Sequence, residues 1–183
     1  MTALDGRVER GARNREAIAD ALLACYEAGI LRPSVAEVAA RAGVSVRSVH
    51  NHFADVEALR ADVAQRQWER HAALLQPAAD VTALAAQRRA FFEAVTPVRR
   101  AVVLTVHNSP TITRRLAQLD RILRDQLRAL FPKLDDDALD ALDAIASWDA
   151  WNRLRTAQHC DADRAQHILE QTIRTLTEGT AVA

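Results

Sequence analysis

A single glycine, Gly43, separates two short helical patterns within residues 34–53, SVAEVAARAGVSVRSVHNHF. Glycine readily adopts the left-handed backbone conformation that ends a helix, so the chain can turn sharply at this point. The apolar residues that fall inward are Val38, Ala39 and Ala42 in the first helix and Val44, Val49 and Phe53 in the second. This arrangement predicts a helix-turn-helix whose second helix presents its other face outward.

The outward face of that second helix carries groups that suit DNA. The planar donors of Arg47 fit guanine O6 and N7, Asn51 suits an adenine edge or a phosphate, and Val46 suits a thymine methyl. Phosphate contacts would set the register of the protein on DNA. The candidates for these contacts are Ser34, Ser45, Ser48, His50 and His52. The alternative is a set of solvated surface residues, with His52 as a packing residue at the helix end.

Charge is distributed unevenly along the chain. The formal net charge is zero, which excludes a globally basic nucleic-acid coat protein. No carboxylate occurs between Glu37 and Asp55, however, and Arg7, Arg10 and Arg13 form a candidate minor-groove arm. A neutral protein with this distribution can present a basic face to phosphates.

Helical periodicity continues through the rest of the chain, and glycine and proline are scarce. Helices are expected at about residues 12–28, 35–42, 46–53, 55–76, 81–95, 98–107, 110–131, 136–158 and 163–177. The expected fold class is therefore all-α with about nine helices. A three-helix helix-turn-helix DNA-binding domain would occupy residues 1–57, and a helical ligand-binding and dimerisation bundle would occupy residues 58–183.

The last two expected helices, 136–158 and 163–177, have apolar faces too broad for one small bundle to cover. A symmetric partner that supplies the same pair would form a four-helix interface, which predicts a homodimer. The alternative is that both helices are central to the core of a monomer.

The stretch from Glu16 to Leu59 resembles the DNA-binding domain of the tetracycline-repressor (TetR) family. The resemblance lies in the aromatic-x-x-Gly end of the first helix at Tyr26–Gly29, the AGVS turn, the His52-Phe53 pair and the helix that follows Asp55. It implies a homodimeric, ligand-responsive transcription factor, usually a repressor that a small molecule releases from a palindromic operator.

Three positions depart from the family pattern. Serine at position 48 replaces threonine, His50 replaces tyrosine, and Val56 replaces a lysine that contacts phosphate. The missing contact would weaken DNA affinity unless Arg60 substitutes for it. An alternative function therefore stays open, a helical dimer of the same fold without operator binding that acts as a small-molecule-binding or protein-interaction module.

A ligand pocket in such a protein would lie among the helices between residues 55 and 158. Its candidate lining combines aromatic and polar side chains, namely Trp68, His71, Phe91, Phe92, His107, Trp148, Trp151 and Asn152. Aromatic residues at helical spacing are equally typical of a core. Arg88 stands in an otherwise apolar row and is expected to extend its charged head to solvent; an inward orientation would favour an acidic ligand.

No catalytic residue, cofactor or metal is expected, because the chain has no Gly-rich phosphate loop, nucleophile elbow or HExxH. Five residues of ligand type lie close together but lack a compact zinc spacing, and a capped helix end explains them better. These are His159, Cys160, Asp161, Asp163 and His167. The sequence has no export signal and no membrane-spanning apolar run, so we expect a cytoplasmic protein. Its expected partners are operator DNA, a second copy of the chain and an unidentified small molecule.

Overall fold

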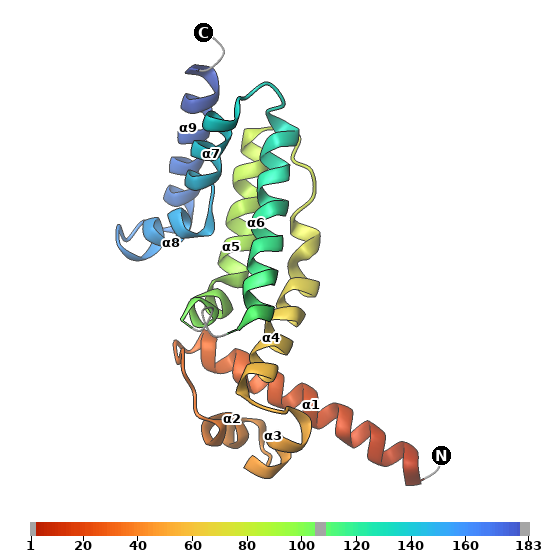
Figure 1. Cartoon of the computed structure of the whole chain (residues 1–183). Coiled ribbons are helices and arrows are strands. Elements are labelled where there is room, and N and C mark those ends of the chain that lie inside the picture. The colour runs from red at the N-terminus through yellow and green to blue at the C-terminus, as the bar shows by residue number, and fades with distance from the viewer. Residues whose placement is uncertain (1–2, 105–108, 180–183) are drawn as a thin grey trace. The chain divides into compact units, whose positions relative to one another are not determined.

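The computed structural model describes residues 3–104 and 109–179, and within these ranges the chain forms nine α-helices, one 3₁₀ turn and no strand (Figure 1). The helices are α1 (Ala3–Glu27), α2 (Val35–Ala42), α3 (Val46–His52), α4 (Val56–His71), α5 (Val81–Val103), α6 (Pro110–Leu130), α7 (Asp136–Ile145), α8 (Trp148–Thr156) and α9 (Ala162–Gly179). The 3₁₀ turn, Ala72–Leu74, follows α4 directly. The expected all-α fold class is confirmed.

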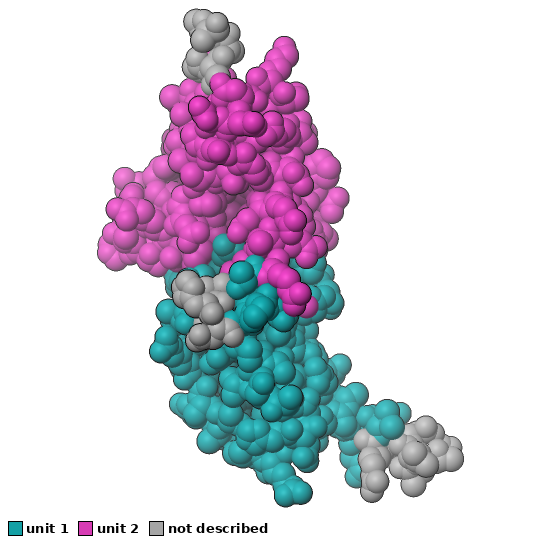
Figure 2. Space-filling model, in the orientation of Figure 1, with its two compact units in different colours: residues 1–70, 97–113 teal, residues 71–96, 114–183 magenta. Residues whose placement is uncertain are grey.

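The chain divides into two compact units, shown in different colours in Figure 2. The first unit holds residues 1–70 and 97–113, and the second holds residues 71–96 and 114–183. Helices α5 and α6 therefore contribute to both units. The expected functional boundary between residues 57 and 58 stays a prediction, because the two units are defined by contacts alone.

In the first unit, α1, α2 and α3 pack against one another (Figure 1). The apolar side of α1 is buried through Ile18, Leu22, Cys25 and Tyr26. Burial of apolar side chains is the main source of stability for helices as short as α2 and α3, which pack against this side of α1. The opposing side chains that complete this core are Val38, Ala39, Val49 and Phe53, each 4% exposed or less.

The turn between α2 and α3 has the geometry expected from its glycine. Gly43 has φ 66° and ψ 29°, in the left-handed region, and Val44 N–H donates to the carbonyl of Ala39 at 3.0 Å. Ser45 then caps α3, since its hydroxyl oxygen accepts a hydrogen bond from the Ser48 N–H at 3.1 Å. The end of one helix and the start of the next are thus set within three residues.

In the second unit, the three C-terminal helices α7, α8 and α9 contact one another. Asp135 caps α7 and Ser147 caps α8, each accepting a backbone N–H three residues on. The buried side chains that form this core include Leu84, Phe91, Phe92, Leu123, Leu127, Leu139, Leu142, Trp151, Leu169 and Ile173.

Four expected helix boundaries are wrong. Helix α4 ends at His71 rather than near residue 76, and the 3₁₀ turn follows it. Helix α1 begins at Ala3 rather than near residue 12, because apolar periodicity marks only buried turns and no proline between residues 3 and 11 interrupts the helix. Helix α5 continues through Pro97; one residue earlier, the Thr96 hydroxyl donates to the Phe92 carbonyl at 2.5 Å, an extra bond in the turn that proline weakens. The expected helix 136–158 is divided in two by the Ser147 cap.

Gly43→Ala is expected to lower the free energy of unfolding by about 1–2 kcal/mol, because an L side chain is strained in the left-handed region. A Cβ at this position meets nothing within 4 Å, so the effect is one of backbone conformation alone. Urea unfolding followed by circular dichroism measures the change. Gly43→Asn is the control and should lose less, since asparagine tolerates this region better. Equal stability of Gly43→Ala and the native chain would contradict the account.

Candidate functional site

The outward face of α3 is open to solvent. Val46 is 42% exposed, and Arg47, His50 and Asn51 are also exposed. Val49, on the opposite face of the same helix, is 4% exposed. The structure therefore brings these four candidate DNA contacts together on one side of a single helix.

Ser34 and Ser45 serve first as helix caps. The Ser34 hydroxyl accepts the Glu37 N–H at 3.2 Å and donates to the Glu37 carboxylate at 2.7 Å, which forms a capping box. Hydrogen bonds from the Ser34 backbone N–H and hydroxyl lower the pKa of Glu37, so this carboxylate stays charged. A phosphate contact by Ser34 remains a prediction, and it requires the capping bond to Glu37 to open. Ser45 is exposed and Ser48 half-buried.

His52 lies against α1. Its Cε1 is 3.9 Å from the position that a Cβ on Gly11 would occupy, and the residue is half-buried. This location fits the alternative prediction for His52, a packing residue at the end of its helix. A phosphate contact from the same side chain stays a prediction.

A cluster around Arg15, which sequence reasoning missed, holds the C-terminal end of α3. The Arg15 guanidinium donates to the His52 carbonyl at 2.8 Å and to Asp62 Oδ1 at 2.5 Å. Its central carbon lies 4.2 Å from the centroid of the Phe53 ring. Arg66 donates to Asp62 Oδ2 at 2.7 Å. We call Arg15, Phe53, Asp62 and Arg66 the Arg15 cluster.

The Arg15 cluster joins three helices of the first unit, because Arg15 lies on α1, Asp62 lies on α4, and Arg15 bonds the last carbonyl of α3 at His52. Burial raises the pKa of Asp62, but hydrogen bonds from Arg15 and Arg66 and their charges outweigh it, so the pKa is lowered. The carboxylate is therefore ionised at neutral pH and bonds both arginines at full strength. No local pattern could have revealed a pair separated by 47 positions.

The arginines of the candidate minor-groove arm and Arg60 are the other basic candidates for DNA contact. Arg10 and Arg13 lie on α1 and are exposed, so the candidate arm is helical across these residues. The side chain of Arg7 lies outside the described part of the chain. Arg60 forms an ion pair with Glu57 at 3.6 Å, which directs it toward its own helix, and Val56 is half-buried. The structure thus offers no evident replacement at Arg60 for the lysine missing at position 56.

The candidate ligand contacts are distributed over both units. Phe92 and Trp151 lie together in the second unit, with ring centroids 6.2 Å apart, and Phe91 and Trp148 are also buried there. Trp68, on α4, belongs to the first unit and is half-buried. His71 and Asn152 are half-buried residues of the second unit. His107 lies outside the described residues.

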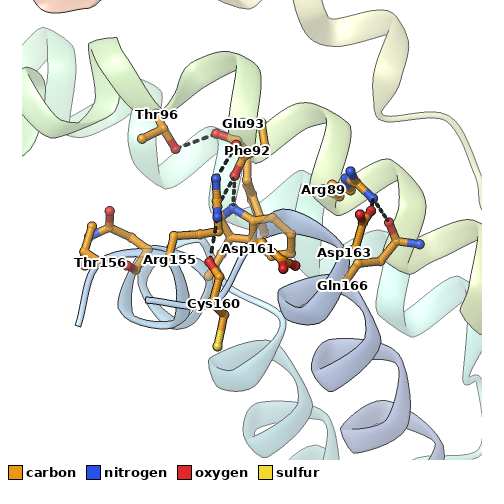
Figure 3. A network of polar contacts seen from close by, with 12 residues as sticks. Arg89, Phe92, Glu93, Thr96, Arg155, Thr156, Cys160, Asp161, Asp163 and Gln166 are labelled. Atoms are coloured by element: carbon orange, nitrogen blue, oxygen red, sulfur yellow. Dashed lines mark hydrogen bonds and ion pairs between the residues drawn. The ribbon is translucent and has the colours of Figure 1, made fainter. Parts of the chain in front are cut away.

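A polar network that includes Glu93, Thr96 and Arg155 (Figure 3) bonds both tryptophans of α8. Trp151 Nε1 donates to Glu93 at 2.9 Å, and Trp148 Nε1 donates to the Thr96 hydroxyl at 3.0 Å. Arg155 donates to both Glu93 oxygens and to the Cys160 carbonyl. Burial raises the pKa of Glu93, but the hydrogen bonds from Arg155 and Trp151 lower this pKa by more than burial raises it. The net pKa is lowered. The indole N–H groups of both buried tryptophans are therefore occupied by side chains of α5.

Arg88 is buried, with 1% of its surface exposed, so the expectation that its head reaches solvent is wrong. It lies on the inward side of α5 between Leu84 and Phe92, one turn away on either side. Hydrophobic periodicity correctly placed Arg88 on the inward side of the helix, and its side chain is buried like those of Leu84 and Phe92.

Within the described residues, no group of three or more His, Cys, Asp or Glu side chains is arranged to hold a metal ion. Two members of the group at the start of α9 have other bonds. Asp161 accepts the Arg164 N–H at 2.7 Å, and Asp163 pairs with Arg89 (Figure 3).

Among the described helices, none combines the length and apolar character needed to cross a membrane.

The sequence matches no protein-family model and no curated protein. Solved structures do match. A transcriptional regulator from Rhodococcus sp. Rha1 is 23% identical, with a TM-score of 0.72 over 90% of this chain and 96% of the other. A TetR transcription regulator from Haloarcula marismortui is 18% identical, with a TM-score of 0.70 over 92% and 98%. The multidrug binding protein EbrR, complexed with imidazole, is 21% identical, with a TM-score of 0.62 over 87% and 91%. The chain thus has the fold of TetR-family regulators.

The Arg15–Asp62 pair is expected to contribute about 1 kcal/mol of coupling energy, after allowance for the partial exposure of Arg15. A double-mutant cycle with Arg15→Met, Asp62→Asn and both changes together measures it in urea unfolding. Arg13→Met is the matched control, an exposed arginine on the same helix, and should change stability little. A coupling energy near zero would mean that the cluster does not hold α3.

Proposed function

We propose that this chain is a ligand-responsive transcriptional repressor that binds a palindromic DNA operator as a homodimer. The observation that carries the proposal is the set of four exposed residues on α3, Val46, Arg47, His50 and Asn51. The helix itself is held on its inward side by apolar contacts and at its end by Arg15. A helix in this setting can enter a major groove without losing its own support. The fold shared with known transcriptional regulators supports the same function.

The four exposed residues of α3 would make different contacts with DNA, some to base edges and some to phosphates. Arg47 would read a guanine through its planar donors, Val46 would touch a thymine methyl, and Asn51 would meet an adenine edge or a phosphate. His50 would contact a phosphate, together with Ser45 and the half-buried Ser48 at the start of the helix. Phosphate contacts of this kind make affinity fall steeply with salt.

Arg47→Ala is expected to weaken binding to the DNA upstream of the protein's own gene by roughly 5- to 150-fold, the loss of one bidentate guanine contact. Gel shifts at several salt concentrations measure the affinity for this duplex and for a random duplex. Arg121→Ala is the control, because Arg121 is exposed on α6 in the second unit and its Nε donates to the Ala117 carbonyl of the same helix. Equal losses on both duplexes would exclude a base-reading role.

The alternative of a module without operator binding has one observation in its favour. Arg60 is paired with Glu57, so the phosphate contact absent at Val56 has no ready substitute. The same gel shifts decide the question, because a module of this kind would bind neither duplex in a salt-dependent way.

The dimer would form through residues 136–158 and 163–177, now resolved as α7, α8 and α9. Apolar side chains on these helices are only partly covered within the chain. Leu176 is 39% exposed, and Ile145, Leu154 and Ile168 are half-buried. A second copy of the same surface would cover them, as in four-helix interfaces between symmetric partners.

Leu176→Glu is expected to weaken self-association at least tenfold, because a charge would be buried without a partner in the proposed interface. Sedimentation velocity over a range of protein concentrations measures the dissociation constant. Thr175→Glu adds the same charge at the neighbouring exposed position and should have a smaller effect. A native chain that sediments as a monomer at every concentration would contradict the dimer.

The response to a ligand would act through α4. Asp62 of α4 bonds Arg15, and Arg15 bonds the last carbonyl of α3, so a displacement of α4 reaches the reading helix within the first unit. A ligand that favours one placement of α4 would shift the population of DNA-competent dimers. EbrR, which shares this fold, has been crystallised with imidazole and with ethidium, and this supports small-molecule binding here.

A further inference from the structure

Arg88 is a buried cation with incomplete hydrogen bonding. Its Nη2 donates to the Leu123 carbonyl of α6 at 2.7 Å. Its Nε and Nη1 are buried and have no hydrogen-bond partner. Buried donors are almost always satisfied in folded proteins, and an exception calls for an explanation. In Arg88, two of the three guanidinium nitrogens lack a hydrogen-bond partner.

No described carboxylate forms an ion pair with Arg88. Burial lowers the pKa of the guanidinium to about 10, while the charge of Asp143 raises it, so the group is still cationic at neutral pH. Asp143 is engaged elsewhere, since its Oδ2 lies 3.7 Å from Arg124 Nη1. Burial also raises the pKa of Asp143, against the attraction of Arg124 and Arg88. A buried cation without a close counterion is unfavourable, so another anion would be bound tightly.

Arg88 also has apolar neighbours. Leu84 and Phe92 lie one turn away on the same helix, and the Phe92 ring centroid is 5.9 Å from the guanidinium carbon. Leu127, one turn beyond Leu123 on α6, is completely buried. A planar guanidinium in such a setting matches a carboxylate attached to an apolar body, because the fork pairs with two oxygens while the walls exclude water.

We propose that Arg88 anchors a binding site in the second unit for a monocarboxylic acid with an apolar body. The proposal rests on the ligand response described above and gives its effector a chemical class. Binding requires local opening of the bundle, because the unpartnered nitrogens are not exposed.

The test measures the melting temperature of the purified full chain, without DNA, in the presence of hexanoate, octanoate and phenylacetate and of their primary amides. The acids are expected to raise the melting temperature by roughly 5–10 °C at one hundred times the dissociation constant, and the amides to have little effect. Failure of all three acids, or equal shifts from acids and amides, would overturn the proposal.

Arg88→Met is expected to abolish the shift caused by the acids and to leave the ligand-free melting temperature equal or higher, because an uncompensated buried charge is removed. Arg121→Met, an exposed arginine on α6, should respond as the native chain does. An Arg88→Met protein that keeps the shift would overturn the proposal. If Arg88→Met does not fold, Arg88→Lys decides, because it keeps the charge without the planar fork; binding at least tenfold weaker supports the anchor, and unchanged binding refutes it.

These measurements do not depend on DNA. A chain that binds no operator would still show the response to carboxylates, and a chain that binds its operator without this response would overturn only the anchor at Arg88.

Discussion

The proposed function depends on the contacts that fix the position of α3 in the first unit. A helix of seven residues is not stable in water by itself, so its conformation comes from what surrounds it. Val49 and Phe53 attach its inward side to the core, Ser45 caps its start, and Arg15 bonds the carbonyl at its end. Because these supports all lie on the inner face or at the ends, the outer face stays free for a partner.

Two polar arrangements in the second unit differ in burial and in completeness: the Glu93–Arg155 pair is partly exposed, and Arg88 is buried. Around Glu93, the indole of Trp151 and the guanidinium of Arg155 satisfy a carboxylate whose own charge is compensated. Around Arg88, a fully buried cation keeps two nitrogens without hydrogen-bond partners. A complete network stabilises one arrangement of helices, whereas an incomplete one favours whatever anion can complete it. The first therefore suits a structural brace, and the second suits a recognition site.

Local sequence signals predicted the parts of this structure that depend on neighbours in the chain. The turn at Gly43 and the caps at Ser34 and Ser45 are set by residues within three or four positions, and the outward row on α3 follows from them. The count of nine helices agrees only because two boundary errors cancel, a helix uninterrupted at Pro97 and a helix divided at Ser147. Arg15 bonding Asp62 depends on tertiary contacts, which no local pattern encodes.

The most direct test of the account is selection of bound duplexes from a random-sequence pool by the purified full-length protein. The account predicts an enriched palindrome, with half-site centres separated by about 10 base pairs or a multiple of that distance. Such a motif would require both a reading helix and a symmetric pair of chains. A pool without enrichment, or an enriched site without two-fold symmetry, would contradict the central claim that α3 is presented to DNA by a dimer.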